Sequence, residues 1–321
     1  MDKRFVEVVK SGVFGLAVAD ACGVPVEFSY REDLDKSPVT EMFGYGTYNQ
    51  PPGTWSDDTS MTLCLMDTLC EKYELINTME AFCKWYKDGE YTPFGICFDI
   101  GMTVEAALRK FINGTEISKC GAIEEDSNGN GSLMRILPLA FYIRLQGVHT
   151  PFERKSHIEL VHSVSALTHA HMRSMIACGI YTSVAMALID NPSKESIKKG
   201  LYAAKQYYLN EKELKHYWRI FKNNFGDLPR KEIKSSGYVV DTLEAALWCL
   251  YTTENYEDCV LKAVNLGSDT DTVAAVAGGL AGLLYGLDYI PSKWIDCLIQ
   301  KDIIIKCCEN FLIRNELKDE K

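Results

Sequence analysis

Apolar residues recur along most of this chain at intervals of three and four positions, which is the spacing of one face of an α-helix. Strand-like alternation is almost absent. The stretch "SGYVVDTL" at 236–243 could begin extended, but it leads directly into "EAALWCLY". Most prolines fall between the periodic segments and mark their ends. The segments predicted to be helical or rich in helix are 4–19, 56–72, 76–87, 101–112, 156–190, 195–209, 211–224, 241–251, 256–265, 272–286 and 291–313.

The chain shows no internal boundary. No segment is low in complexity, and no linker rich in Gly and Ser divides the 321 residues. Length alone would also allow two domains, but the pattern favours a single compact all-α domain over residues 1–321. The segment "TVAAVAGGLAGLLYG" is rich in Ala and Gly. Because Gly inside a helix costs roughly 1 kcal/mol relative to Ala, we expect neighbouring backbones to approach this helix closely and bury it.

Composition excludes several classes of partner. A hydrophobic content of 47% and a charged content of 24% are enough for a sizeable core. The net charge of −10 argues against non-specific binding to nucleic acid or to anionic membranes. We expect no apolar run of membrane-spanning length and no signal peptide. The twelve cysteines form no C-x-x-C pair, so we expect reduced thiols in a cytoplasmic protein, which we take to be a monomer.

Two acidic clusters stand at the start of apolar helical segments. The first is "GTWSDDTSM", with Asp57 and Asp58, and the second is "GSDTDT", with Asp269 and Asp271. One such cluster would be helix capping more often than not, because Ser, Thr and Asp favour the first turn. Two clusters overloaded with hard oxygen ligands favour a site for Mg²⁺, Mn²⁺ or Ca²⁺. Two divalent ions would neutralise the four carboxylates, as in two-metal enzymes.

A third feature is the glycine-rich stretch "DSNGNG" at 126–131. It begins like a calcium-binding EF-hand loop, but the twelfth position, which requires Glu, is Leu137. The spacing does not match G-x-G-x-x-G either, because Met134 occupies the sixth place. The Gly129-Asn130-Gly131 run is an ordinary turn, or a turn that leads into a helix and approaches a phosphate through its N–H groups.

Several stretches together resemble the ADP-ribosylglycohydrolase family, and they occur in the family's order over about residues 12–286. These stretches are "GVFGLAVADACGVPVEF", "GTWSDDTSMTLCLMDTL", "FDIGMTVEAAL", "GNGSLMRILPLAF", "SALTHAHMRS", "GYVVDTLEAALW" and "GSDTDTVAAVAGGLAGLLYG". The resemblance implies a compact all-α fold, a cleft that holds two Mg²⁺ or Mn²⁺ ions, and hydrolysis of the glycosidic bond between ADP-ribose and a protein side chain. The partners it implies are an ADP-ribosylated protein as substrate and ADP-ribose as product.

The resemblance also assigns expected roles to individual residues. The expected metal ligands are Ser56, Asp57, Asp58, Asp269, Asp271 and Thr272. The residues expected to bind ADP-ribose are Asn130, Gly131, Ser132 and Met134 at the diphosphate and distal ribose, Thr168 and His169 in the groove, and Gly237 and Tyr238 at the adenine. Without this context, His169 and Tyr238 would be assigned to the core. His171 is expected to be structural.

The expected proton-transfer groups are carboxylates near the metals, and the candidates are Asp57, Asp58, Asp99 and Glu27. Glu27 could instead be a surface residue, and Asp99 could be the N-cap of the helix that begins near Gly101. The stretch "CFDIGMTVEAAL", which contains Asp99, resembles the branch that removes ADP-ribose from arginine, including the bacterial ADP-ribosyl-dinitrogen-reductase hydrolases. The expected function is therefore metal-dependent hydrolysis of the N-glycosidic bond to arginine.

Other functions stay open at this point. The enzyme could act on another ADP-ribose linkage, to serine or in O-acetyl-ADP-ribose. A two-metal phosphatase would also use acidic clusters, but it would need no Gly-Asn-Gly loop. A non-catalytic ADP-ribose-binding protein or a structural protein is the third alternative, although both acidic clusters are intact.

Overall fold

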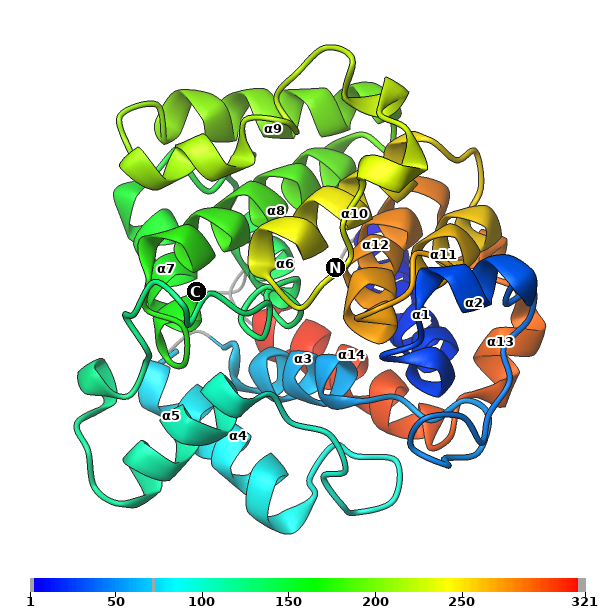
Figure 1. The fold of residues 1–321 in the computed structure, drawn as a ribbon. Coiled ribbons are helices and arrows are strands. Elements are labelled where there is room, and N and C mark those ends of the chain that lie inside the picture. The colour runs from blue at the N-terminus through cyan, green and yellow to red at the C-terminus, as the bar shows by residue number, and fades with distance from the viewer. Residues whose placement is uncertain (1–2, 71–72, 317–321) are drawn as a thin grey trace.

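Helix α12 (Thr270–Tyr285) runs through the centre of the molecule, and every residue from Thr270 to Leu283 is buried. Helix α1 (Lys3–Gly23) lies directly against it (Figure 1). The contact requires residues without side chains: a Cβ added at Gly15 would lie 2.4 Å from the carbonyl oxygen of Gly278. The prediction that this Ala- and Gly-rich helix is buried under close backbone contacts is confirmed.

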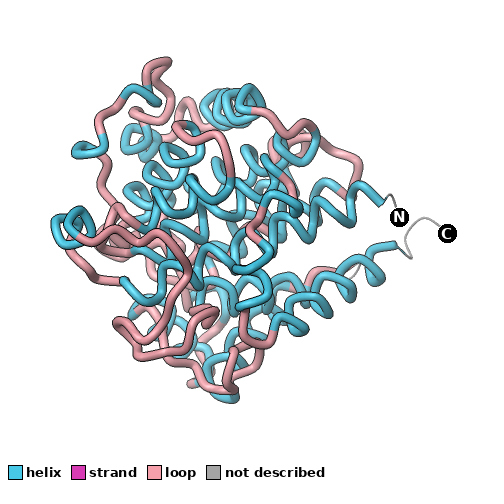
Figure 2. Tube along the Cα trace, turned by 90° about the vertical axis from the view of Figure 1, so that its right-hand side faces the viewer, coloured by secondary structure: helices cyan, strands magenta, loops and turns pink. Residues whose placement is uncertain are grey.

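The fold is all-α, as predicted. The computed structural model describes residues 3–70 and 73–316, and Figure 2 shows helices and loops but no strand in this part of the chain. The other α-helices are α2 (Arg31–Lys36), α3 (Asp57–Thr68), α4 (Leu75–Asp88), α5 (Met102–Ile112), α6 (Pro138–Arg144), α7 (Lys155–Ala166), α8 (Met172–Asp190), α9 (Lys194–Tyr207), α10 (Val239–Tyr251), α11 (Tyr256–Val264), α13 (Ser292–Cys297) and α14 (Lys301–Glu316). The 3-10 helices are η1 (Val24–Val26), η2 (Ile117–Lys119), η3 (Lys212–Tyr217), η4 (Phe225–Asp227), η5 (Arg230–Glu232) and η6 (Leu287–Tyr289).

The helices form layers around α12. Helices α1, α10 and α11 pack directly against α12, and α9 lies outside α8, on the far side of it from α12 (Figure 1). Helix α3 contacts both α1 and α12 as well as α4 and α14. The N-termini of α3 and α12 are therefore both close to the C-terminal half of α1. The division into domains is not decided by this arrangement, so the single domain stays a prediction.

The predicted helix 156–190 is in fact two helices, α7 and α8. The chain leaves helical geometry at residues 167–171 because its backbone bonds elsewhere: Ala122 donates its N–H to the Thr168 carbonyl, at 2.9 Å, and the Ala170 N–H bonds to the Ala122 carbonyl, at 2.7 Å. The side chain of His171 then caps α8 by accepting a hydrogen bond from the N–H of Arg173. That contact agrees with the structural role expected for His171.

Two other predicted elements also differ from the structure. Only Lys212–Tyr217 of the predicted helix 211–224 is helical, as the 3-10 helix η3. The segment 291–313 is broken at Leu298–Gln300, where the N–H of Ile299 bonds to the carbonyl of Gly53. Residues 236–238 are extended and lead into α10, as the sequence allowed. Positions 71 and 72 of the predicted helix 56–72 lie outside the described residues.

Helix α8 corrects the expectation that no apolar run reaches membrane-spanning length. A window of 18 of its 19 residues has a mean hydropathy of 1.5, which meets the requirements of length and composition for a span. In the structure 83% of this window is buried inside the protein. Its apolar character is therefore accounted for by contacts with other helices. All twelve cysteines are free of disulfides in the structure.

Candidate active site

Carboxylates from distant parts of the sequence meet where α1, α3 and α12 come together. Oxygen atoms of Asp20, Asp58 and Asp271 all lie within 4.8 Å of one another. A second group of three, formed by Glu27, Asp99 and Asp271, fulfils the same criterion. Because Asp271 belongs to both groups, they form one continuous cluster, and Asp57 and Asp269 repel its members at close range. We call these seven carboxylates the acidic centre.

Helix capping explains only part of the first predicted cluster. Ser56 is the N-cap of α3, and its hydroxyl accepts the N–H of Asp58 at 3.3 Å. The same hydroxyl donates to Asp58 Oδ2 at 3.0 Å. The other carboxylate oxygen of Asp58, Oδ1, is buried and has no hydrogen-bond partner. A cap needs one oxygen acceptor, and Ser56 already supplies it, so the two aspartates are in excess of what capping requires.

The second predicted cluster adjoins the first. Asp269 is the N-cap of α12, but its side chain makes no capping hydrogen bond. Thr272, in the first turn of α12, donates its hydroxyl to Asp58 Oδ2 at 3.3 Å. The structure thus brings together the two "Ser/Thr plus two aspartates" stretches, as the sequence predicted.

Asp20 belongs to the acidic centre, although the sequence did not single it out. It lies in the otherwise apolar stretch "GLAVADACG" of α1 and is fully buried. Its carboxylate accepts the N–H groups of Ser56 and Thr59, at 3.0 and 3.1 Å, and the hydroxyl of Thr59 at 2.6 Å. It therefore fixes the N-terminus of α3 against α1. One charged residue inside an apolar helical run was the signal that could have identified it.

Tyr48 is a second residue that the sequence did not reveal. It lies in the loop between α2 and α3, and its hydroxyl hydrogen-bonds to the carboxyl groups of Glu27 and Asp99. Its ring lies edge-on to Phe98, with centroids 5.3 Å apart. Tyrosine in a loop carries no distinctive pattern, so only the folded structure shows this contact.

Burial and mutual repulsion raise the pKa values throughout the acidic centre. Desolvation is the larger cause for Glu27, whose pKa rises to about 8, and the charge of Asp99 adds to it. Desolvation also raises the pKa values of Asp20 and Asp99, each to about 6. Three further carboxyl groups have pKa values well above the usual range, again chiefly through desolvation, and these are Asp57, Asp58 and Asp271.

The donor set fits divalent cations that prefer oxygen. Among the residues that the structure describes, no lysine or arginine forms an ion pair with a carboxylate of the acidic centre. Three buried oxygens there have no hydrogen-bond partner: Glu27 Oε2, Asp58 Oδ1 and Asp269 Oδ1. Unpaired buried carboxylate oxygens are costly unless a cation compensates them. Carboxylates and hydroxyls select Mg²⁺, Mn²⁺ or Ca²⁺, so the acidic residues cluster as a possible metal site.

The Gly-Asn-Gly loop lies directly beside the acidic centre. The side-chain amide of Asn130 donates to Asp269 Oδ2 at 2.9 Å and to the Thr242 hydroxyl at 3.0 Å. Its backbone N–H bonds to the carbonyl of Gly237 at 3.0 Å. A Cβ added at Gly237 would lie 3.0 Å from Asp269 Oδ2, so Gly237 is also adjacent. The expectation that this loop leads directly into a helix was wrong, because turns separate it from α6.

Several other residues expected to bind ligand lie on the buried side of this loop, and they are Ser132, Met134, Thr168 and His169. A Cβ at Gly131 would be 3.1 Å from Cε1 of His169, so the two are in contact. The hydroxyl of Thr168 lies 2.8 Å from His169 Nδ1. Burial lowers the pKa of His169 to about 3, so its imidazole is neutral. Ser132 and Thr168 are fully buried and Met134 nearly so, which makes them supports of the loop in this structure.

Arg135 links the Gly131 backbone to Thr168. Its fully buried guanidinium donates to the carbonyl of Gly131 at 2.6 Å and to the Thr168 hydroxyl at 2.7 Å, and it lies 4.7 Å from the centre of the Phe82 ring. On the other side of the loop, the ring of Tyr238 is half-buried, and the guanidinium of Arg173 lies 5.8 Å from its centre.

The structure is an all-α fold with a buried cluster of carboxylates that could hold metal ions, and comparisons with known proteins assign it to a family. The ADP-ribosylglycohydrolase family model matches residues 1–321. The chain is 35% identical over 310 residues to an ADP-ribosylarginine hydrolase Tri1 from Serratia proteamaculans, covering 96% of this chain and 80% of that protein. It is 31% identical over 291 residues to the ADP-ribosyl-dinitrogen reductase glycohydrolase of Rhodospirillum rubrum, covering 89% and 88%.

A solved structure supports the same assignment. An ADP-ribosylglycohydrolase-related protein complex matches with a TM-score of 0.79 and 27% identity, over 98% of this chain and 100% of that one. The chain therefore belongs to the ADP-ribosylglycohydrolase family of enzymes. Membership confirms the resemblance seen in the sequence.

Proposed function

We propose that this enzyme uses two Mg²⁺ or Mn²⁺ ions to hydrolyse the N-glycosidic bond between ADP-ribose and an arginine side chain of a modified protein. One observation carries the proposal: a buried group of carboxylates with unpaired oxygens adjoins the Asn130 loop. The names of relatives at 31–35% identity, which are hydrolases of ADP-ribosylarginine and of ADP-ribosyl-dinitrogen reductase, support the acceptor.

Residues at the starts of α3 and α12 would hold the ions. The proposed ligands are Ser56, Asp57, Asp58, Asp269, Asp271 and Thr272, and Asp20 is a further carboxylate within reach of this group. When bound, such ions supply positive charge that fixes vicinal hydroxyls and stabilises charge in the transition state. The chain itself contributes the arrangement: Asp20 and the Ser56 cap fix the first turn of α3, so these carboxylates are held in place before a ligand arrives.

The proton transfers are assigned to the pair Glu27 and Asp99. Carboxyl groups whose environments separate their pKa values can divide acid and base roles. Glu27, with the higher pKa, would donate a proton to the departing guanidine nitrogen, and Asp99 would accept one from the attacking water. The bond from the anomeric carbon to nitrogen breaks, and a bond from that carbon to the water oxygen forms. Asp58 is the alternative proton acceptor.

The Asn130 loop and the segment at Tyr238 would bind the rest of ADP-ribose. Asn130 and Gly131 would adjoin the distal ribose and the diphosphate, because the amide of Asn130 already contacts Asp269 at the acidic centre. Tyr238 is half-exposed beside Gly237 and would stack on the adenine. The buried residues next to the loop would support it in this conformation, and they are Ser132, Met134, Thr168 and His169.

A turnover panel tests the function. Purified enzyme is incubated with ADP-ribosyl-arginine, ADP-ribosyl-serine and O-acetyl-ADP-ribose, each with added Mg²⁺ or Mn²⁺ and each after exhaustive chelation. We expect metal-dependent release of ADP-ribose from the arginine conjugate. Release of ADP-ribose from only the serine or acetyl substrate would show that arginine is not the acceptor. Full release after chelation would refute the metal-dependent mechanism.

A further inference from the structure

A second cavity lies far from the acidic centre, between α9, the segment 220–225 and the end of α10. It has a volume of 580 Å³, which falls within the range of about 300–1,000 Å³ typical of small-molecule sites. None of its lining residues belongs to the acidic centre or to the Asn130 loop. Helix α9, which supplies most of the lining residues, packs on the outer side of α8 (Figure 1).

The region around this cavity is basic, in contrast to the rest of the protein. Residues 194–234 contain eleven Lys and Arg and five Asp and Glu, a net charge of +6, whereas the whole chain carries −10. Four of these lysines line the cavity: Lys198, Lys199, Lys205 and Lys222. A local positive surface on an acidic protein concentrates anions at that place.

The lysines are held near aromatic rings more than near carboxylates. The ammonium of Lys205 lies 5.9 Å from the centre of the Phe221 ring, and that of Lys198 lies 5.9 Å from the centre of the Tyr251 ring. Lys198 also forms an exposed ion pair with Glu195 at 3.5 Å, but the described residues give Lys205 no such partner. Contact with a ring positions an ammonium group without cancelling its charge.

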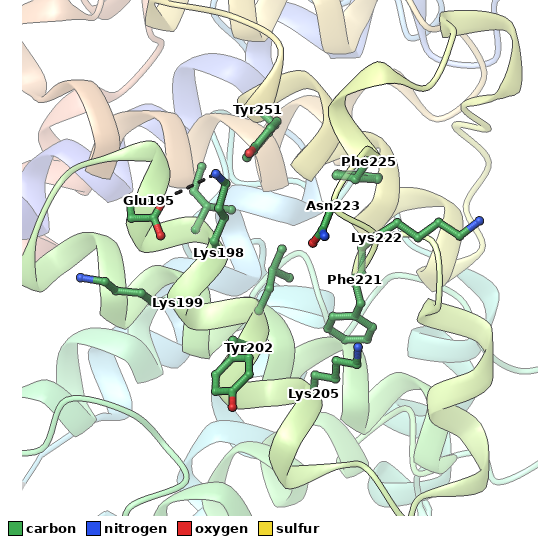
Figure 3. A pocket seen from close by; sticks show the side chains of 13 residues that line it. Glu195, Lys198, Lys199, Tyr202, Lys205, Phe221, Lys222, Asn223, Phe225 and Tyr251 are labelled. Carbon is green, nitrogen blue, oxygen red and sulfur yellow. Dashed lines mark ion pairs between the residues drawn. The ribbon is translucent and has the colours of Figure 1, made fainter.

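Aromatic and amide groups complete the cavity. Figure 3 shows Lys198 and Lys205 at opposite ends of the group, with the Asn223 amide between them and Lys199 and Lys222 extending outward. The ring of Tyr202 is 66% exposed at the border. Positive ends and flat apolar walls complement a planar ring that carries a negative group.

We propose that this cavity binds a small organic anion with an aromatic ring, of about the size of a nucleotide. The ring would lie against the side chains of Phe221 and Tyr202, and the anionic group would meet Lys198 or Lys205. This site is distinct from the acidic centre and does not depend on the proposed hydrolysis.

Calorimetric titration of the whole protein with phenyl phosphate tests the proposal. Inorganic phosphate supplies the charge without the ring, and phenol supplies the ring without the charge. We expect phenyl phosphate to bind with a dissociation constant of about 1 mM or below, and each fragment to bind at least tenfold more weakly. Benzoate in a further titration distinguishes a carboxylate ligand from a phosphate ligand.

Charge reversal locates the binding. The variant Lys198→Glu with Lys205→Glu should weaken phenyl phosphate binding at least tenfold. Lys212→Glu with Lys215→Glu, the same change of charge in the same basic region but outside the cavity, should leave it within twofold. Both pairs are exposed, so folding is retained. Equal losses in the two variants, equal affinity for inorganic phosphate, or no binding of phenyl phosphate would each overturn the proposal.

Discussion

Thr272 on α12 donates a hydrogen bond to Asp58 on α3 across 3.3 Å, although 214 positions separate the two residues in the sequence. This contact joins the two acidic clusters into one centre. Each helix start supplies only some of the oxygens of the acidic centre, so neither cluster could form the proposed metal site by itself. Removing a carboxylate from either side should therefore have the same consequence.

Asp57→Ala and Asp269→Ala should each lower the release of ADP-ribose by at least about 100-fold, because each removes a proposed cation ligand. Steady-state release from ADP-ribosyl-arginine, measured with excess Mg²⁺, checks this. The matched control is Glu159→Ala, which removes an exposed surface carboxylate and should retain full activity. An active Asp57 or Asp269 variant would contradict the proposed site.

Glu27 should make the metal-free protein less stable as the pH rises. Its folded pKa of about 8 lies above the usual 4.5, so its stabilising contribution is complete below about pH 4 and is lost as the pH rises through 8. Glu27→Gln should match the wild type near pH 5 and become more stable than it by pH 9, on the order of 1–2 kcal/mol.

Thermal unfolding in a chelator, at pH values from 5 to 9, provides the measurement. Adding Mg²⁺ or Mn²⁺ should raise the melting temperature of the wild type most at high pH, where the carboxylates are ionised and repel one another. A difference between wild type and variant that does not change with pH would show that Glu27 does not ionise in this range.

Tyr48→Phe should move the acid limb of the pH–activity profile to higher pH. The hydroxyl hydrogen-bonds to Glu27 and Asp99 and lowers the pKa of both, so its loss should raise these values by about one unit, the equivalent of roughly 1.4 kcal/mol. The profile of kcat/KM provides the measurement. Tyr45→Phe, an exposed tyrosine in the same loop, should leave the profile unchanged, and a shift common to both variants would argue against a specific contact.

Gly278→Ala should destabilise the fold by about 1–3 kcal/mol, because a Cβ there would lie 2.3 Å from that of Ala19 and 2.4 Å from the carbonyl oxygen of Gly15. Helix propensity alone predicts the opposite sign, a gain of about 1 kcal/mol. Urea unfolding distinguishes the two. Gly101→Ala, where nothing lies within 4 Å, is the matched control, and a stabilised Gly278→Ala would show that α1 and α12 can separate at little cost.

The sequence was most informative where a pattern repeats. Helical periodicity predicted the all-α fold, and the paired acidic stretches predicted that the two clusters would lie close together. Asp20 was missed because a single carboxylate in an apolar run has no partner within its own segment. Tyr48 was missed because its role depends on how a loop folds over Glu27.

The sequence also did not predict the local breaks in the helices. The interruption at residues 167–171 arises from hydrogen bonds to Ala122, more than forty positions earlier, and contains neither Gly nor Pro. Periodicity records which face is buried, and it continues across such a break. Breaks of this kind are consequences of tertiary contacts.

The contact between α1 and α12 has a consequence for biosynthesis. Thr270 bonds through its hydroxyl to the carbonyl of Gly23, 247 positions away. Because Asp20 and Asp58 leave the ribosome long before Asp271, the early part of the nascent chain exposes carboxylates whose neighbours have not yet been made. The acidic centre is thus assembled late, by closure of a very long loop, and no fragment that ends before α12 can possess it.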